Sequence, residues 1–150
     1  MLVKDIMTAS VRSAKPEDMI RDVAEVMCFN KISGMPVVDG DGKIVGVISE
    51  KDILHGMFPK FHEIMENASP PDFEAMERDY TSIVNLRVSN LMSPNVFTVG
   101  PDIPVLKAAS IMFTKRIRRI PVSENGKLLG IVSVGDVHKA IFRMNLTKTA

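Results

Sequence analysis

The sequence is poor in cysteine and in large aromatic residues. Of its 150 residues, one is cysteine, one is tyrosine and none is tryptophan. The single Cys28 can form neither an internal disulfide nor a cysteine-based metal site, so we expect a fold that depends on its core in a reducing, cytoplasmic compartment. Eleven methionines predict an aliphatic, adaptable core. We assign Cys28 a buried apolar role in it.

Long apolar runs and a strong net charge are also missing. No run of about 20 apolar residues occurs, and Lys4 and Asp5 interrupt the N-terminus, so we expect neither a membrane partner nor a signal peptide. A net charge of +1 is typical of a globular protein and gives no electrostatic footprint for nucleic acid.

Motifs for catalysis and for metal binding are absent as well. The sequence contains no Walker or GxGxxG pattern, and no group of residues combines an acid, a base and a nucleophile, so we expect no enzyme. His55, His62 and His138 are scattered without metal-ligand spacing. We therefore expect no metal and no required cofactor.

What the sequence does contain is an internal repeat. The stretch GVISEKDIL at 46–54 returns as GIVSVGDVH at 130–138, with a serine three residues ahead of an aspartate each time. The match continues backward, past one extra residue in the first copy's turn, as far as Met7 and Met92. A duplicated unit accounts for this pattern.

Each copy predicts the order strand, helix, hairpin, helix. We place the start of the first helix at Pro16 and Pro101, where acidic residues follow the proline. Two short β-branched runs around turn residues then predict a hairpin, and a second helix begins at Ser49 or Ser133. The expected class is α+β, with two pseudo-symmetric repeats that pack through their small sheets because neither is large enough alone.

Residues 56–87 have no counterpart in the repeat. They contain two apolar stripes of helical spacing, separated by Pro70 and Pro71. The stripes are Met57, Phe58, Phe61, Ile64 and Met65, and then Phe73, Met76, Tyr80, Ile83 and Val84. We expect repeat one at 1–55, a helical insert at 56–87 and repeat two at 88–145. The insert either covers the core or a dimer contact, or docks another protein.

The repeated Ser-x-x-Asp motif has two interpretations. It can be a helix capping box, in which hydroxyl and carboxylate satisfy backbone amides. The shorter Asp in place of the usual Glu also suits a ligand site. In such a site the carboxylate accepts hydrogen bonds from ribose hydroxyls, and the helix N-terminus attracts phosphate. The ligand interpretation requires carboxylates that face open grooves.

The two copies differ most in charge. Repeat two has KRIRR at 115–119 where repeat one has NKISG. These cations can complement a helix C-terminus, or Arg116, Arg118 and Arg119 can clamp phosphate. A nucleic-acid patch is the third and least favoured interpretation. If one groove holds a phosphorylated ligand, we expect it in repeat two.

These motifs resemble those of a known family. LMSPNVFTV, RRIPV and GKLLGIVSVGD, with their companions DIMTASVRS, GMPVV and GKIVGVISEKD, are similar to a tandem pair of cystathionine-β-synthase (CBS) domains, or Bateman module. The resemblance covers about residues 3–55 and 88–142 and rests on the doubled occurrence in the same order.

The resemblance implies clefts for adenosine-containing ligands and a homodimer. The implied ligand-binding residues come from both repeats: Asp52 and Asp136 for ribose hydroxyls, Ser49 and Ser133 for phosphate, Ser10, Val11, Asn95 and Val96 beside adenine, and Met35 and Ile120 against the base. We therefore expect a stand-alone regulatory sensor of AMP, ADP, ATP or S-adenosylmethionine that acts on an unidentified protein. The alternative is a ligand-free assembly module that docks a partner through the insert.

Overall fold

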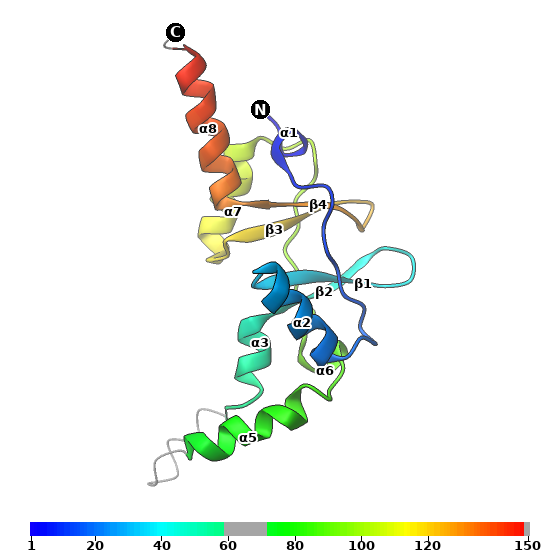
Figure 1. Ribbon diagram of the computed structural model, residues 1–150. Helices are drawn as coiled ribbons and strands as arrows, with labels where there is room; N and C mark the ends of the chain where they lie inside the picture. The colour runs from blue at the N-terminus through cyan, green and yellow to red at the C-terminus, as the bar shows by residue number, and fades with distance from the viewer. Residues whose placement is uncertain (59–71, 149–150) are drawn as a thin grey trace. The chain divides into compact units, whose positions relative to one another are not determined.

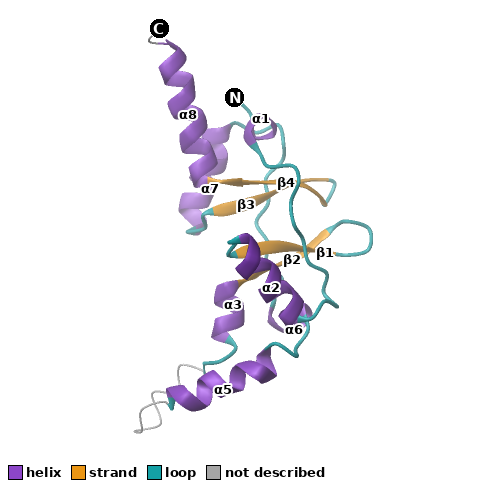
Figure 2. Cartoon of the chain, viewed as in Figure 1, coloured by secondary structure: helices purple, strands orange, loops and turns teal. Residues whose placement is uncertain are grey.

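The computed structural model describes residues 1–58 and 72–148, and combines helices with small sheets (Figure 1, Figure 2). In chain order the elements are α1 (Val3–Ile6), α2 (Ile20–Asn30), β1 (Gly34–Val38), β2 (Ile44–Ser49), α3 (Glu50–His55), α5 (Phe73–Ile83), α6 (Val88–Leu91), α7 (Val105–Lys115), β3 (Arg119–Glu124), β4 (Lys127–Ser133) and α8 (Val134–Lys148). The predicted α+β class is confirmed.

Both predicted hairpins form. Strand β1 pairs with β2, and β3 pairs antiparallel with β4, in two separate sheets. The turns contain Gly42 and Gly126 at φ values of 79° and 80°. Glycine reaches this left-handed region without the steric cost that a β-carbon imposes. The turn glycines of the repeat therefore set where each hairpin reverses.

The first helix of each repeat begins later than we predicted. Helices α2 and α7 start at Ile20 and Val105, not at Pro16 and Pro101. The carbonyl oxygen of Pro16 accepts a hydrogen bond from the amide of Ser89 at 2.9 Å. The carbonyl oxygen of Pro101 likewise accepts one from the amide of Lys4 at 2.9 Å. The prediction was wrong because these carbonyl groups bind distant backbone instead of starting a helical ladder.

The chain divides into two compact units that differ from the sequence repeats. Unit 1 comprises Met1–Arg12, Gly40–Ile44 and Val96–Ala150, and unit 2 comprises Ser13–Asp39 and Val45–Asn95. We call residues 1–12 and 88–95 the leading segments, because they open repeats one and two. Each leading segment lies in the unit built mainly from the other repeat, so the repeats exchange their first segments.

In unit 1 the leading segment 1–12 extends the β3–β4 sheet. Thr8 bridges Ile131 of β4 in antiparallel fashion. Val3 is fully buried in the unit 1 core, and its amide donates to the carbonyl oxygen of Ile103 at 2.9 Å. Backbone pairing and side-chain burial both fix this segment in place.

Unit 2 repeats the arrangement with the leading segment 88–95. Ser93 bridges Val47 of β2, and Val88 is fully buried in the unit 2 core. The amide of Val88 donates to the carbonyl oxygen of Asp18 at 2.8 Å. The exchange is therefore reciprocal and has the same geometry in both units.

Each unit has its own apolar core. The unit 1 core contains Val3, Val99, Val105, Ala108, Ala109, Met112, Ile120, Val122, Val132 and Val137. The unit 2 core contains Ala14, Ile20, Val23, Met27, Met35, Val37, Ile48, Ile53 and Val88. Full burial of one such aliphatic side chain contributes roughly 1.5–3 kcal/mol. The cores place the ends of β2 and β4 and the starts of α3 and α8.

The second stripe of the insert forms helix α5. Asp72 caps it, with the Ala75 amide donating to Oδ1 of Asp72 at 3.1 Å, and Ile83 packs against the unit 2 core. Of the first stripe, Met57 and Phe58 follow α3 in a turn, whereas Phe61, Ile64 and Met65, with Pro70 and Pro71, fall outside the described residues. Throughout the described ranges, no helix combines the length and the apolar character that crossing a bilayer requires.

Candidate functional site

The strand-to-helix turn of unit 1 is built by Ser133 and Asp136. The Ser133 amide donates to Oδ2 of Asp136 at 2.9 Å, and the Asp136 amide donates to Oγ of Ser133 at 3.0 Å. These reciprocal bonds satisfy amides that would otherwise lack partners at the start of α8. The capping interpretation of the motif is confirmed here.

Unit 2 uses Ser49 and Asp52 in the same way. The Ser49 amide donates to Oδ2 of Asp52 at 2.9 Å, and the Asp52 amide donates to Oγ of Ser49 at 3.2 Å. Each cap engages Oδ2 of its aspartate, and Oδ1 bonds to none of the described residues. An ionised carboxylate has about four acceptor sites. Capping therefore leaves each aspartate able to accept a further hydrogen bond, and both side chains are half-buried rather than enclosed.

A groove of about 640 Å³ opens beside the α8 cap. We call it the arginine groove, and it is lined by Met112, Phe113, Arg116, Ile117, Arg118, Arg119, Ser133, Val134 and Gly135. Four of the predicted site residues thus meet in one place within unit 1. No motif in the sequence singled out Phe113, which is 69% exposed, or Val134 and Gly135 of the first turn of α8.

The arginine groove is suited to an anion. Three arginines and no acidic side chain line it, and neither Arg116 nor Arg118 has an acidic partner within the described part of the chain. The α8 N-terminus adds the positive end of a helix dipole. Lys115 does not contribute, because its Nζ lies 4.5 Å from the centroid of the Phe97 ring. The groove therefore offers a phosphate or carboxylate the paired N–H donors of guanidinium groups and the positive end of the α8 helix dipole.

The matching region of unit 2 has a different charge. Glu50 occupies the position of Val134, and Ser33 and Gly34 stand where repeat two has Arg118 and Arg119. Helix α3 has six residues, against fifteen in α8. Of the three groove arginines, only Arg116 has a cationic counterpart in this region of unit 2, which is Lys31.

The remaining predicted site residues lie elsewhere. Met35 and Ile120 are in the two cores, with 5% and 0% exposure, and present almost no side-chain surface. Ser10 and Asn95 are exposed, and Val11 and Val96 are half-buried. None of these residues lines the arginine groove.

Unit 2 has a second, smaller groove, which corrects our assignment of Cys28. This tyrosine groove has a volume of about 190 Å³ and is lined by Ala24, Met27, Cys28, Glu50, Ile53, Leu54 and Tyr80. Cys28 is exposed, so a buried role was wrong. It follows the buried Met27 by about 100° around the helix, which turns its thiol from the core toward the groove.

Acidic and imidazole side chains do not gather in the described ranges. No group of three or more His, Cys, Asp or Glu residues there could hold a metal ion. His55 and His138 are exposed, and His62 falls outside the described residues.

Comparison with known sequences identifies both repeats. The model of the CBS domain matches residues 3–58 and 88–143. The chain is 34% identical to the uncharacterised protein MJ1426 of Methanocaldococcus jannaschii, over 94% of this chain and 91% of that protein. It is 29% identical to the chloroplastic CBS domain-containing protein CBSX1 of Arabidopsis thaliana, over 87% of this chain and 58% of that protein.

Solved structures give the same result for the fold. CBSX2 of Arabidopsis thaliana, a CBS-pair protein, matches with a TM-score of 0.78 and 26% identity over 96% of both chains. The complex of CBSX2 with AMP matches with a TM-score of 0.73 and 27% identity, over 96% of this chain and 98% of that one. These matches confirm the resemblance to a tandem pair that the sequence motifs indicated.

Proposed function

We propose, because the chain belongs to the CBS domain family, that it is a regulatory sensor that binds an adenine nucleotide or another adenosyl ligand without catalysis. The observation that carries this proposal is the arginine groove, where three arginines meet the capped N-terminus of α8. The AMP complex of the relative CBSX2 supports the choice of ligand class.

The groove residues have distinct roles in this proposal. Arg116, Arg118 and Arg119 bind the phosphate groups, since the planar guanidinium matches phosphate oxygens with two parallel hydrogen bonds. Ser133 also lines the groove and can donate its hydroxyl to phosphate. Asp136 does not line the groove itself but bonds to the lining residue Ser133; in this proposal it keeps that cap through Oδ2 and accepts a hydrogen bond from a ribose hydroxyl through Oδ1.

We assign the other predicted residues to the nucleoside. Ser10, Val11, Asn95 and Val96 border the adenine, and Met35 and Ile120 support the base from the cores. In unit 2, which is built mainly from repeat one, Asp52 occupies the corresponding ribose position and Ser49 the corresponding phosphate position. Because Glu50 repels phosphate there, we assign the phosphorylated ligand to unit 1.

The proposed output is a change of arrangement. A ligand shifts an equilibrium between two arrangements only by its difference in affinity for them. We infer that the sensor is a cytoplasmic homodimer and that ligand binding alters how its parts are arranged, which a regulated protein then recognises. No chemical step is required.

Thermal melting tests the proposal. The purified protein is melted with AMP, ADP, ATP, S-adenosylmethionine or buffer. A ligand at 100 times its dissociation constant adds about 2.7 kcal/mol, which raises the midpoint of a chain of this length by roughly 5–10 °C. The double variant Arg116→Ala/Arg118→Ala is expected to lose most of the shift with AMP.

Lys31→Ala provides the matched control, since Lys31 occupies in unit 2 the position that Arg116 occupies in unit 1. It is expected to keep the full shift. If no ligand moves the midpoint of the natural sequence, the sensor proposal is wrong. If the arginine variant shifts as much as the natural sequence, the phosphate site is not the arginine groove.

A ligand-free assembly module is the second candidate. It is favoured by one observation: both Ser–Asp pairs already satisfy their own amides without a ligand. On this alternative the insert helix α5, whose Phe73 is 66% exposed, docks another protein. A melting curve unchanged by every ligand, together with stable self-association or partner binding, would favour it.

A further inference from the structure

The net charge of +1 is the sum of two units that carry opposite charges. Unit 1 contains twelve lysine and arginine residues and five aspartate and glutamate residues, which give it a net charge of +7. The same residue types number seven and thirteen in unit 2, which therefore has a net charge of −6. The small charge of the whole chain gave no electrostatic footprint for nucleic acid, whereas unit 1 by itself has one.

The positive charge of unit 1 gathers on α7, on α8 and on the residues that follow α7. Asp136 is the single carboxylate in the two helices, and its Oδ2 is engaged in the cap of α8. Asp102, which precedes α7, forms an ion pair with Lys4 at 2.8 Å. The exposed cations of these elements include Lys107, Lys115, Arg116, Arg118, Lys139 and Arg143. Because α7 and α8 pack against one another, we call their exposed sides together the basic surface.

The phenyl rings of unit 1 are all at its surface. Its three phenylalanines are Phe97, Phe113 and Phe142, which are 45%, 69% and 55% exposed. The unit 1 core holds aliphatic side chains and Met112 instead. Phenylalanine is among the residue types most often buried, so three exposed rings beside a core without one indicate a surface that binds a partner.

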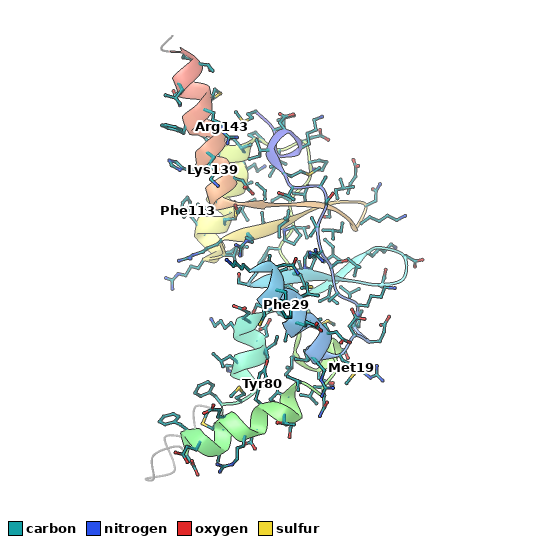
Figure 3. The ribbon with its side chains drawn as sticks, in the orientation of Figure 1. Met19, Phe29, Tyr80, Phe113, Lys139 and Arg143 are labelled. Atoms are coloured by element: carbon teal, nitrogen blue, oxygen red, sulfur yellow. The ribbon has the colours of Figure 1, made fainter. Side chains whose placement is uncertain are left out.

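Two of these rings have a cation beside them near the end of α7. The Nζ atom of Lys115 lies 4.5 Å from the centroid of the Phe97 ring. Phe113 projects from α7 (Figure 3) and lines the arginine groove together with Arg116. Aromatic and positive groups are therefore neighbours on this part of the basic surface.

Helix α8 repeats this combination. The ring centroid of Phe142 lies 6.5 Å from that of His138, and Lys139 and Arg143 are exposed on the same helix (Figure 3). With about 100° per residue, these four side chains fall within an arc of about 140°, away from Val137 in the core. Ring and cations thus share one face, whereas a helix that lies on a membrane separates its apolar face from its charged one.

We propose that the basic surface binds single-stranded nucleic acid, with the phosphates on its cations and bases stacked on Phe113 and Phe142. Proteins that bind single strands without sequence preference combine a positive surface along the backbone with aromatic rings for the bases. Every base has a π-face, so this mode of binding needs no base-specific hydrogen bonds. The basic surface offers both kinds of group within one unit.

A single strand suits the exposed rings better than a duplex does. In a duplex the bases stack on one another and present only their edges in the grooves, so Phe113 and Phe142 would have no base to stack on. Unit 2, with its net charge of −6, repels a polyanion. We therefore assign the contact to unit 1 alone.

Fluorescence anisotropy with the full chain tests the proposal. The probes are labelled strands of oligothymidine and of oligouridine of about 16 nucleotides, the upper end of the site sizes of single-strand binding folds, and a DNA duplex of the same length. The natural sequence should bind at least one of the two single strands more tightly than the duplex. Binding that favours the duplex, or no binding to either strand, overturns the proposal.

Two double variants separate stacking from charge. Phe113→Ala/Phe142→Ala should weaken binding by about tenfold or more, because each lost stacking contact carries a cost of that order. Lys139→Ala/Arg143→Ala should lower the slope of log affinity against log salt by about 1.4, because each phosphate contact to a single strand contributes about 0.7. Salt slopes that do not differ between Lys139→Ala/Arg143→Ala and the natural sequence overturn the proposed phosphate contacts.

Phe29→Ala is the matched control for the stacking variant. Phe29 is 80% exposed on α2 of unit 2 (Figure 3), among side chains of the negatively charged unit. This variant should keep the full affinity for the single strand. Equal losses from Phe29→Ala and from Phe113→Ala/Phe142→Ala, or no loss from the latter, would show that bases do not stack on the basic surface.

Other anions serve as competitors. Dextran sulfate carries charge without bases, and vesicles of phosphatidylserine and phosphatidylcholine present an anionic membrane. If dextran sulfate displaces the strand as well, charge for charge, as unlabelled strand does, the surface binds any polyanion and the proposal is wrong. Tight binding to the vesicles without binding to the strands would identify a membrane surface, which also overturns it.

The nucleic-acid proposal does not rest on the adenosyl ligand. Lys139 and Arg143 do not line the arginine groove, so Lys139→Ala/Arg143→Ala should keep the melting shift with AMP. Strand binding without any shift would refute the sensor alone, and a shift without strand binding would refute the nucleic-acid contact alone.

Discussion

A β-carbon on Gly130 would lie 2.7 Å from the carbonyl oxygen of Thr8. Thr8 belongs to the leading segment that pairs with β4, so the repeated glycine marks the place where that segment lies against the strand. Gly46 has the same role, because a β-carbon there would lie 2.9 Å from the carbonyl oxygen of Ser93. Both contacts are with backbone, which cannot move aside as a flexible side chain can.

We therefore expect Gly130→Ala and Gly46→Ala each to destabilise the protein by about 1–3 kcal/mol, as overpacking does in other cores. Urea unfolding measures the loss. Gly100→Ala is the control, because no atom lies within 4 Å of its added β-carbon and its φ is not positive. Equal stability of all three variants would show that the leading segments are not held against the glycines.

The exchange of leading segments predicts which core each segment supports. Val3→Ala should cost about 1–3 kcal/mol through lost burial and a residual cavity. Hydrogen exchange should then rise in α7 and β4 of unit 1, because Val3 packs in that core. Val88→Ala should instead raise exchange in α2 and β2 of unit 2. If amide hydrogen exchange instead became faster in the repeat that contains the substitution, the leading segments would not pack in the cores described above.

The C-termini of α2 and α7 offer a pair of substitutions with different consequences. Lys31 and Arg116 cap these helices at φ values of 53° and 55°, in the left-handed region. Glycine removes the β-carbon clash there, so Lys31→Gly and Arg116→Gly should each stabilise the protein by about 1 kcal/mol.

Only one of these two variants should affect the ligand. Arg116→Gly removes a guanidinium from the arginine groove, so its melting shift with AMP should fall although its ligand-free midpoint rises. Lys31→Gly should keep the shift. If both variants showed the same melting shift with AMP, the guanidinium of Arg116 would not contribute to ligand binding.

The ion pair between Lys4 and Asp102 predicts a small dependence on pH. Its hydrogen bond at 2.8 Å and the charge of Asp102 raise the pKa of Lys4 above its ordinary value of 10.5. A group with a raised pKa contributes stability that is fully present below the ordinary pKa and is lost as the pH rises through the folded-state pKa.

The melting midpoint should therefore fall above pH 10.5 more steeply in the natural sequence than in Lys4→Met. The other lysines titrate equally in both proteins, so the difference between the two curves isolates Lys4. The effect should be small because the pair is exposed and screened by salt. Parallel curves would mean that the ion pair does not persist in solution.

Local patterns in the sequence predicted the hairpins and the second helix of each repeat, whereas the expected opening strand of each repeat was wrong: a short helix and isolated β-bridges stand there. The hairpins followed from turn glycines between β-branched runs, and the second helix of each repeat followed from a serine cap, because these signals act over a few residues. The convergence of Arg116, Arg118, Arg119 and Ser133 on one groove was also within reach, since the repeat aligns a helix end with a strand end.

The exchange of leading segments was not predictable from the same patterns. The duplication places residues 1–12 within repeat one, whereas their hydrogen-bond partners Ile103 and Ile131 lie far along the chain, in repeat two. The spacing of apolar residues along the sequence reports only local structure and cannot indicate hydrogen bonds between distant segments. The late starts of α2 and α7 have the same origin, because the carbonyl groups before them are occupied by the exchanged segments.

Because the leading segments are exchanged, each half of the chain supplies one segment to the other half's unit and receives one in return. A cut anywhere between residues 58 and 72, outside the described elements, would yield two fragments that each hold a leading segment paired with a strand of the other fragment. Such halves should remain associated after cleavage and reassemble from separate polypeptides, whereas either half alone would leave a glycine-lined sheet edge uncovered. The two copies therefore depend on each other for folding, since deleting either copy removes a leading segment from the unit that remains.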